Sequence, residues 1–220
     1  MNDEFGFIRD NYLRITEAVD KAGGARIMAV TKTVPAERVN FALSLGIDLI
    51  GENRVQEYLS KKDEYEPVEM HIIGHLQSNK VKYIIDDAAM IQSVDTVSLA
   101  EEISRLAIRH GRVMDILCEI NIGGEESKSG FSPDGLEENL SRIGELKGVR
   151  IKGLMAIPPP FDSVKYFERM KALYDGLSGR TYMDMEILSM GMSGDYEAAI
   201  KCGSNLVRIG SALFGKRIYK

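Results

Sequence analysis

The sequence predicts an α/β fold: one (β/α)₈ barrel of the TIM type, with an extra helix at its N-terminus. Two observations carry this prediction. Short apolar runs alternate with amphipathic segments to the end of the chain, and there are about eight of these runs, the number that such a barrel requires. Strands separated by helices favour a parallel sheet covered on both faces. A doubly wound open sheet shows the same alternation, so strand number alone leaves it open.

The elements follow one another in a regular order. Phe7, Ile8, Tyr12, Ile15 and Val19 recur at helical spacing, and Gly23-Gly24 ends this first helix. Strands are predicted at 26–31, 47–50, 69–73, 90–94, 113–121, 150–156, 185–189 and 206–209. Helices are predicted between them at 36–45, 55–62, 96–109, 133–146, 161–177 and 196–201.

Polar motifs follow most of the predicted strands, and these favour the barrel over the open sheet. They are Thr31-Lys32, Gly51-Glu52-Asn53, Gly74 to Lys80, Asn121, Ala156-Ile157-Pro158, Met190 to Gly194 and Gly210-Ser211. In a barrel all loops that follow strands share one rim, which is where this fold places ligands and chemistry.

Length and composition bound the class of protein. The 220 residues are 44% hydrophobic and 28% charged, enough for one large core, so residues 1–220 are expected to form a single domain. A net charge of −5 argues against a basic nucleic-acid surface. No nucleic-acid partner is therefore expected.

Targeting and cysteine patterns indicate a cytoplasmic protein. The acidic start Met1-Asn2-Asp3-Glu4 is unlike a secretory signal or transit peptide, and no apolar run is long enough to span a membrane. Cys118 and Cys202 lie far apart, without the spacing of a disulfide framework or a zinc motif. A reducing cytoplasm is the expected location, with no membrane partner.

Lys32 places a lone ammonium at the carboxyl end of the first strand. A lysine at such a position is most often a solvated loop charge. The second half of the chain favours a functional role, because Arg208 lies in the last strand-like run, two residues before Gly210. The alternative for Arg208 is a structural ion pair.

The loops after the last two strands predict a phosphate site. Ser193 is expected to cap the helix that begins near Tyr196, and a simple helix start is the alternative explanation of this motif. These two loops are the usual phosphate site of the fold, and glycines permit close backbone approach. We expect a phosphate cup built from Gly191, Ser193, Gly194, Gly210 and Ser211.

A lysine, an arginine and a phosphate cup on one rim suggest a ligand with a carbonyl group, a ring and a phosphate. Pyridoxal 5′-phosphate has all three. The Lys32 amine would condense with its aldehyde to a Schiff base. An Arg208 guanidinium would donate to the pyridine nitrogen and disfavour its protonation, which makes the ring a weaker electron sink.

The three histidines do not predict a metal site. His71 and His75 are four residues apart, but the strand-like run around His71 and Gly74 argue against the helix that this spacing needs. His71 is expected inside the barrel or against a ligand, and His110 at the end of a helix. No metal is expected.

Several ordered motifs together resemble the pyridoxal phosphate homeostasis proteins, single-domain relatives of the N-terminal barrel of alanine racemase. The similarity covers nearly the whole chain. The motifs are Ala29-Val30-Thr31-Lys32, Gly51 to Glu57, His71 to Lys80, Lys128-Ser129-Gly130, Leu188 to Ser193 and Val207 to Gly210. One departure is His75, where related proteins often have proline.

The resemblance implies a role for each candidate. Lys32 would carry the Schiff base, Arg208 would face the pyridine nitrogen, and Asn53 would lie beside the cofactor. Ser193, Gly210 and Ser211 would hold the phosphate. The family is regarded as binding and distributing the cofactor, so the expected function is buffering pyridoxal phosphate or delivering it to apo-enzymes, without turnover.

Two enzyme functions remain as alternatives. A low-activity amino-acid racemase or lyase would use Lys32 as one base and a loop tyrosine or lysine as the other. In alanine racemase the second acid/base comes from an additional domain of a partner subunit, and no such domain is expected in this chain after the eighth predicted strand. A class I aldolase with a sugar-phosphate substrate is the other alternative.

Overall fold

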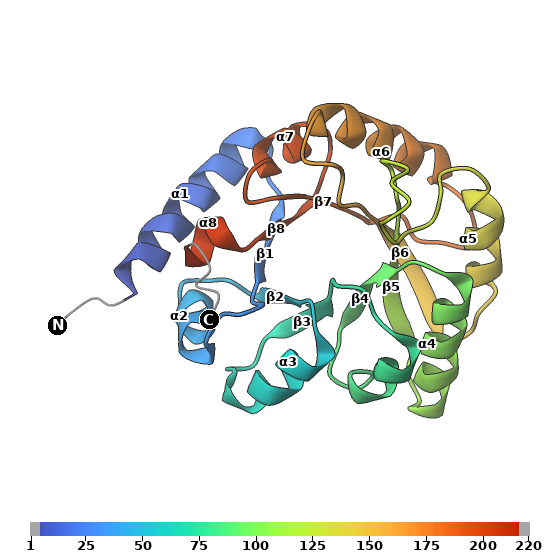
Figure 1. The fold of residues 1–220 in the computed structure, drawn as a ribbon, viewed down its shortest axis with the longest axis horizontal. Coiled ribbons are helices and arrows are strands. Elements are labelled where there is room, and N and C mark those ends of the chain that lie inside the picture. Colours follow the sequence, from blue (N-terminus) through green and yellow to red (C-terminus); the bar gives the residue numbers. More distant parts are fainter. Residues whose placement is uncertain (1–4, 216–220) are drawn as a thin grey trace.

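The computed structural model describes residues 5–215; the acidic N-terminal motif and the ends of the expected 1–220 domain lie outside this range. Eight parallel strands close into a barrel in the order of the sequence (Figure 1). They are β1 (Arg26–Val30), β2 (Leu49–Glu52), β3 (Glu69–Ile72), β4 (Met90–Val94), β5 (Met114–Glu119), β6 (Val149–Met155), β7 (Ile187–Met192) and β8 (Leu206–Ile209). Because β1 pairs with both β2 and β8, the sheet has no edge, and the predicted barrel is confirmed over the open sheet.

Helices surround the barrel as an outer ring (Figure 1). They are α1 (Gly6–Ala22), α2 (Ala36–Ser44), α3 (Val55–Lys61), α4 (Val97–Arg109), α5 (Leu136–Gly144), α6 (Ser163–Leu177), α7 (Tyr196–Lys201) and α8 (Ser211–Phe214). Two 3₁₀ helices, η1 (Lys62–Glu64) and η2 (Ser78–Tyr83), complete the described elements. None of the described helices is both long and apolar enough to cross a membrane.

The extra N-terminal helix is present. α1 lies on the outside of the ring, beside α7 and α8 (Figure 1), and buries Ile8, Ile15 and Val19. It ends where Gly23 adopts a φ of 127°, a conformation that glycine reaches at low cost. The helix thus packs against the elements that follow the last two strands.

The core has two parts. Most buried apolar side chains lie between the strands and the outer helices. The barrel interior holds two small apolar clusters, the larger around Met28, Leu49 and Leu206. Polar side chains share this interior, among them Gln92 and Ser189, each 0% exposed. An interior of mixed polarity departs from the branched apolar filling usual in this fold.

Two strands lie further along the chain than the sequence predicts. β2 ends at Glu52, whose carboxylate is 0% exposed, so an acidic residue belongs to a buried strand. β7 extends through Gly191, although glycine is ordinarily a sign of a loop. Both errors arise because residues with a loop-like composition are recruited into strands at the rim.

The histidines lie where the sequence places them. His71 is in β3 and 1% exposed, and His75 follows that strand outside any helix. His110 directly follows α4, where its Nδ1 lies 2.9 Å from the Asp86 carboxylate. In the described part of the chain, no cluster of three or more potential ligands could hold a metal ion.

Candidate functional site

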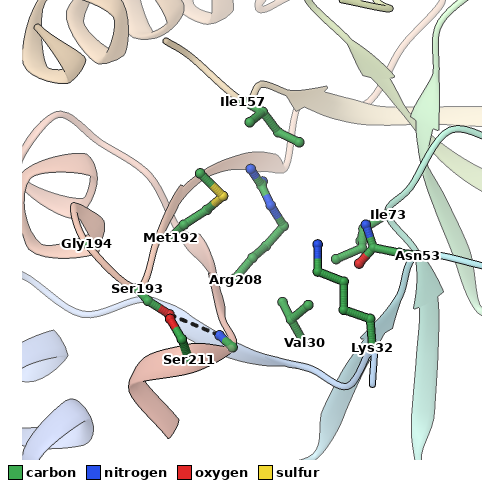
Figure 2. A pocket seen from close by; sticks show the side chains of 11 residues that line it. Val30, Lys32, Asn53, Ile73, Ile157, Met192, Ser193, Gly194, Arg208 and Ser211 are labelled. Atoms are coloured by element: carbon green, nitrogen blue, oxygen red, sulfur yellow. Dashed lines mark hydrogen bonds between the residues drawn. The ribbon is translucent and has the colours of Figure 1, made fainter. Parts of the chain in front are cut away.

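A cavity of about 310 Å³ opens at the carboxyl ends of the strands. All of the expected site residues line it except Gly191. The lining residues are Val30, Lys32, Asn53, Ile73, Ile157, Met192, Ser193, Gly194, Arg208, Gly210 and Ser211. Figure 2 shows the side chains of Lys32 and Arg208 pointing into the same space. Residues nearly 180 positions apart thus meet because β8 pairs with β1.

Lys32 lies in a tight turn directly after β1. The amide of Val34 donates to the Thr31 carbonyl at 3.0 Å, and Thr33 has a φ of 61°. A β-branched residue in the left-handed region costs energy and persists only where its surroundings impose it. The surroundings therefore have to hold this turn in place.

Lys61 of α3 holds this turn through hydrogen bonds. Its ammonium donates to the carbonyl oxygens of Thr31 and Val34, at 3.2 and 3.3 Å. It also pairs with Glu57 at 2.9 Å and lies 3.7 Å from Glu52. We name Glu52, Glu57 and Lys61 the lysine-loop clamp, since each contacts the segment that carries Lys32.

The two carboxylates of the clamp have pKa shifts of opposite sign. Burial raises the pKa of Glu52, and the Lys61 charge with hydrogen bonds from Thr31 and Tyr65 only partly offsets this. Burial also acts to raise the pKa of Glu57, but hydrogen bonds from Lys61 and the Thr33 amide lower it overall. Sequence reasoning missed this clamp; its signal is an acidic residue inside an apolar strand.

Ser193 has a different role from the one expected. The first residue before α7 is Asp195, whose carboxylate accepts the Met192 amide at 2.7 Å. The Ser193 hydroxyl instead accepts the amides of Gly210 and Ala212, at 3.2 and 3.1 Å (dashed line from Ser193 in Figure 2). The prediction of a helix cap for α7 is thus wrong, and Ser193 joins the two loops of the cup.

Gly191 does not take the expected place in the cup. Its φ is 92°, and a Cβ atom added there would lie 2.5 Å from Cβ of Ala199 in α7. The missing side chain lets α7 pack against β7, so the role of this glycine is in packing. The cup that lines the cavity consists of Ser193, Gly194, Gly210 and Ser211.

Arg208 is a buried cation, 3% exposed. Its Nη1 donates to Ser189 Oγ at 2.6 Å, and its Nη2 donates to the Ala156 carbonyl at 2.8 Å. Burial lowers the pKa of Arg208 to about 10, against the attraction of Glu119. The group therefore stays protonated at neutral pH, with neutral oxygens as its hydrogen-bond partners.

Asn53 supplies an unpaired acceptor. It follows β2, and its Oδ1 is buried without a hydrogen-bond partner among the described residues. Buried polar atoms are normally paired, so an unpaired one at a cavity wall is a candidate contact for a ligand hydroxyl. Figure 2 shows Asn53 beside Lys32.

Two further cavities adjoin the first and share Asn53 with it. One, of about 500 Å³, lies between Lys32, Glu57 and His75. The other, of about 300 Å³, is lined by His75, Glu119 and Lys128 among others. His75 Nδ1 lies 2.9 Å from the Asp95 carboxylate. Burial raises the pKa of Glu119, and repulsion from Asp95 adds to this effect.

Comparisons with known proteins show which family the chain resembles. The family model described as the alanine racemase N-terminal domain matches residues 6–218. The pyridoxal phosphate homeostasis protein of Aquifex aeolicus is 41% identical over 216 residues, covering 94% of this chain and 95% of its own. That of Pseudomonas aeruginosa is 38% identical, covering 94% and 92%.

Solved structures of other proteins have the same fold as this chain. PipY of Synechococcus elongatus with pyridoxal phosphate bound has a TM-score of 0.85 and 29% identity, covering 94% of this chain and 100% of its own. A protein of unknown function from Bifidobacterium adolescentis has a TM-score of 0.89 and 34% identity, covering 97% of both chains. The alanine racemase of Corynebacterium glutamicum shares the fold, with a TM-score of 0.76, 17% identity and coverage of 97% of this chain and 61% of its own.

Proposed function

The chain belongs to the pyridoxal phosphate homeostasis proteins, within the alanine racemase N-terminal domain family, and from this premise we propose that it carries pyridoxal 5′-phosphate as a Schiff base on Lys32. Its role would be to buffer the cofactor or deliver it to apo-enzymes, as one domain spanning residues 1–220. One observation carries the proposal: Lys32, Arg208 and the neutral cup line the same cavity.

The residues present fit the cofactor. A volume of about 310 Å³ lies within the usual range for small-ligand sites. The unpaired Oδ1 of Asn53 suits the ring hydroxyl, and the hydroxyls of Ser193 and Ser211 suit a phosphate. The buried Arg208 offers an N–H donor to the pyridine nitrogen.

Each residue has a distinct task in binding. The Lys32 nitrogen, as the neutral amine, forms a C=N bond with the aldehyde carbon, and the carbonyl oxygen leaves as water. The lysine-loop clamp fixes the backbone around this amine. When bound, the cofactor supplies an electrophilic carbon conjugated to a ring that can accept electrons. Arg208 limits that acceptance, because a protonated guanidinium beside the ring nitrogen disfavours its protonation.

This weak electron sink favours a carrier over an enzyme. The alternative of a low-activity racemase or lyase needs a second base near Lys32. No tyrosine of the described residues lines any of the three cavities, whereas Lys128 lines the third. Exchange of an amino-acid α-proton into deuterated water, lost in Lys128→Gln, would favour the enzyme; the carrier predicts no exchange above that of free pyridoxal phosphate.

The Schiff base is tested by adding pyridoxal phosphate, reducing with borohydride and mapping the modified peptide by mass. We expect a visible absorbance band and a reduced adduct on Lys32, with both absent from Lys32→Ala. Ser193→Ala should keep the adduct but weaken retention by about ten- to a hundredfold, since a hydrogen bond to a charged group contributes roughly 1.5–3 kcal/mol. An adduct that survives unchanged in Lys32→Ala would contradict the proposal. No adduct in the wild type would favour the sugar-phosphate aldolase.

A further inference from the structure

A line of buried polar side chains crosses the barrel interior below the cavity. Nη1 of Arg208 on β8 donates to Ser189 Oγ on β7 at 2.6 Å. Ser189 Oγ in turn donates to Gln92 Oε1 on β4 at 2.8 Å, a bond that spans the barrel. Nε2 of Gln92 lies 2.8 Å from Nδ1 of His71 on β3. Arg208 is 3% exposed, His71 1%, and the other two 0%.

The line continues to the opposite end of the barrel. Nε2 of His71 lies 2.8 Å from the Glu69 carboxylate, which Arg26 binds through two nitrogens, at 2.8 and 3.2 Å. Arg26 also pairs with Asp48. Arg26 and Glu69 are the first residues of β1 and β3, so they lie at the end of the barrel away from the cavity. A continuous hydrogen-bonded path therefore joins Arg208 to a surface ion pair.

From Arg208 to Glu69, each residue along this path donates a hydrogen bond to the next one. Hydrogen bonds from His71 and Arg26 lower the pKa of Glu69 to about 2, so at neutral pH its carboxylate only accepts, and His71 Nε2 is the donor. Nε2 of Gln92 can only donate, so Nδ1 of His71 accepts from it, and Oε1 of Gln92 accepts from the Ser189 hydroxyl. Ser189 Oγ, polarised by this bond, is a stronger acceptor for Arg208, since hydrogen bonds in a chain reinforce one another.

An apolar interior would be the simpler way to fill the barrel, because replacing buried polar groups by apolar ones of similar size is often neutral or stabilising. The polar path instead fixes the orientation of the Arg208 guanidinium. Two of its nitrogens are fixed, one by Ser189 and one by the Ala156 carbonyl. Fixing both sets the plane of the guanidinium and therefore the direction of its remaining N–H groups.

We propose that Ser189, Gln92 and His71 are positioning residues for Arg208, and that their path couples the hydrogen bond that Arg208 offers the pyridine nitrogen to the ion pair of Glu69. This inference rests on the proposed function, because it concerns the same cofactor site. Breaking the path frees the guanidinium to rotate. The bound ring then loses a directed donor, although Lys32 and the cup are untouched.

Ser189→Ala and Gln92→Met break the path at two points while retaining similar volume. The matched control is Ser104→Ala, which removes a buried hydroxyl on α4 that accepts the Gly148 amide at 3.0 Å, outside the path. Two quantities are measured: the retention of pyridoxal phosphate and the pH midpoint of the visible Schiff-base band. The ring ¹⁵N resonances of His71 are followed as the cofactor is added.

In the wild type we expect the His71 resonances to shift on binding. Both path variants should weaken retention by about five- to twentyfold, within the usual range of coupling between sites, and should move the pH midpoint of the band. The double variant should lose little more than either single one, since both interrupt one path. Ser104→Ala should retain wild-type values.

The outcomes separate the two proposals. No Schiff-base band in the wild type overturns the proposed function and this inference with it. A wild-type band, with folded path variants that keep its midpoint and its affinity, overturns the positioning role alone. Ser189→Ala guards against misfolding in Gln92→Met, because loss of one hydroxyl leaves the packing nearly unchanged.

Discussion

The two walls of the cavity are held in place by different kinds of interaction. The wall that carries Lys32 is held by charges, since Lys61 bridges the carbonyl oxygens of the turn and two carboxylates, one of them fully buried. The two loops of the opposite cup are joined by a neutral group, the Ser193 hydroxyl, which accepts two backbone amides. One wall therefore depends on a few side chains and the other mainly on the backbone.

This difference suits two kinds of ligand contact. A covalent bond needs its nitrogen at one point, and strong interactions around a strained turn can impose that. A phosphate is a diffuse anion that several weak neutral donors can hold. The charged wall should accordingly be sensitive to single substitutions of side chains, and the neutral wall to changes in backbone geometry.

The largest effect is expected from Lys61→Met. This change leaves Glu52 buried without its cation, and removing one partner of a buried pair costs about 3–5 kcal/mol. Urea unfolding at neutral pH measures the loss in free energy of unfolding. Formation of the Schiff base should also slow, because the turn that presents Lys32 loses two donors.

Lys62→Met is the matched control, since the neighbouring lysine pairs with Asp87 at 2.9 Å near the surface. Such an exposed pair is screened by solvent and contributes far less than a buried one. Adding Glu52→Gln to Lys61→Met should recover part of the stability by removing the unpaired charge. If Lys61→Met and Lys62→Met lost the same free energy of unfolding, the lysine-loop clamp would stabilise the protein no more than a surface ion pair does.

Behind the neutral wall the sensitive position is Gly191, where β7 packs against α7. An alanine there would place Cβ 2.5 Å from Cβ of Ala199, at a φ of 92° that side chains rarely adopt. We expect a loss of about 2 kcal/mol in the free energy of unfolding, from strain and overpacking together. Gly194→Ala is the control, because its Cβ would have no neighbour within 4 Å. Similar stability of the two variants would contradict the proposed packing role.

The sequence was sufficient for the barrel, its extra helix and most of the cavity wall. Lys32, Arg208 and the cup could be found because a charged residue or a glycine after an apolar run is visible in one dimension. The position of these runs in a closed sheet then placed them on one rim. Local sequence pattern and strand order were thus enough to locate residues that line the cavity from the end of their own strand.

What the sequence missed depends on contacts between distant segments. Glu52 and Lys61 meet the turn of Lys32 from another strand and helix, and no local pattern reports this. Ser189 and Gln92 lie 97 positions apart and join across the barrel. The role of Gly191 depends on the approach of α7. Ser193 does not cap α7, because Asp195, two residues later, takes the position before that helix.

The smallest effect is a pH dependence confined to the charged wall. Glu57 accepts from the Thr33 amide and has a lowered pKa, so its contribution to stability is present above its ordinary value of 4.5 and is lost as the pH falls through the lowered one. Glu52 has a raised pKa and acts in the opposite direction, because acid relieves the burial of its charge. The two effects partly cancel in the global stability.

The local effect at Thr33 should nevertheless remain visible. Amide hydrogen exchange, corrected for the intrinsic effect of pH, should show Thr33 losing protection below about pH 4.5, by less than about 1 kcal/mol because Glu57 is partly exposed. The Gly210 amide should keep its protection, since its acceptor is the hydroxyl of Ser193, which does not titrate in this range. Glu57→Gln should abolish the pH dependence at Thr33. If Thr33 and Gly210 lost protection in parallel, acid would be loosening the whole rim, and the contrast between a charged wall and a neutral wall would not describe how this cavity is held.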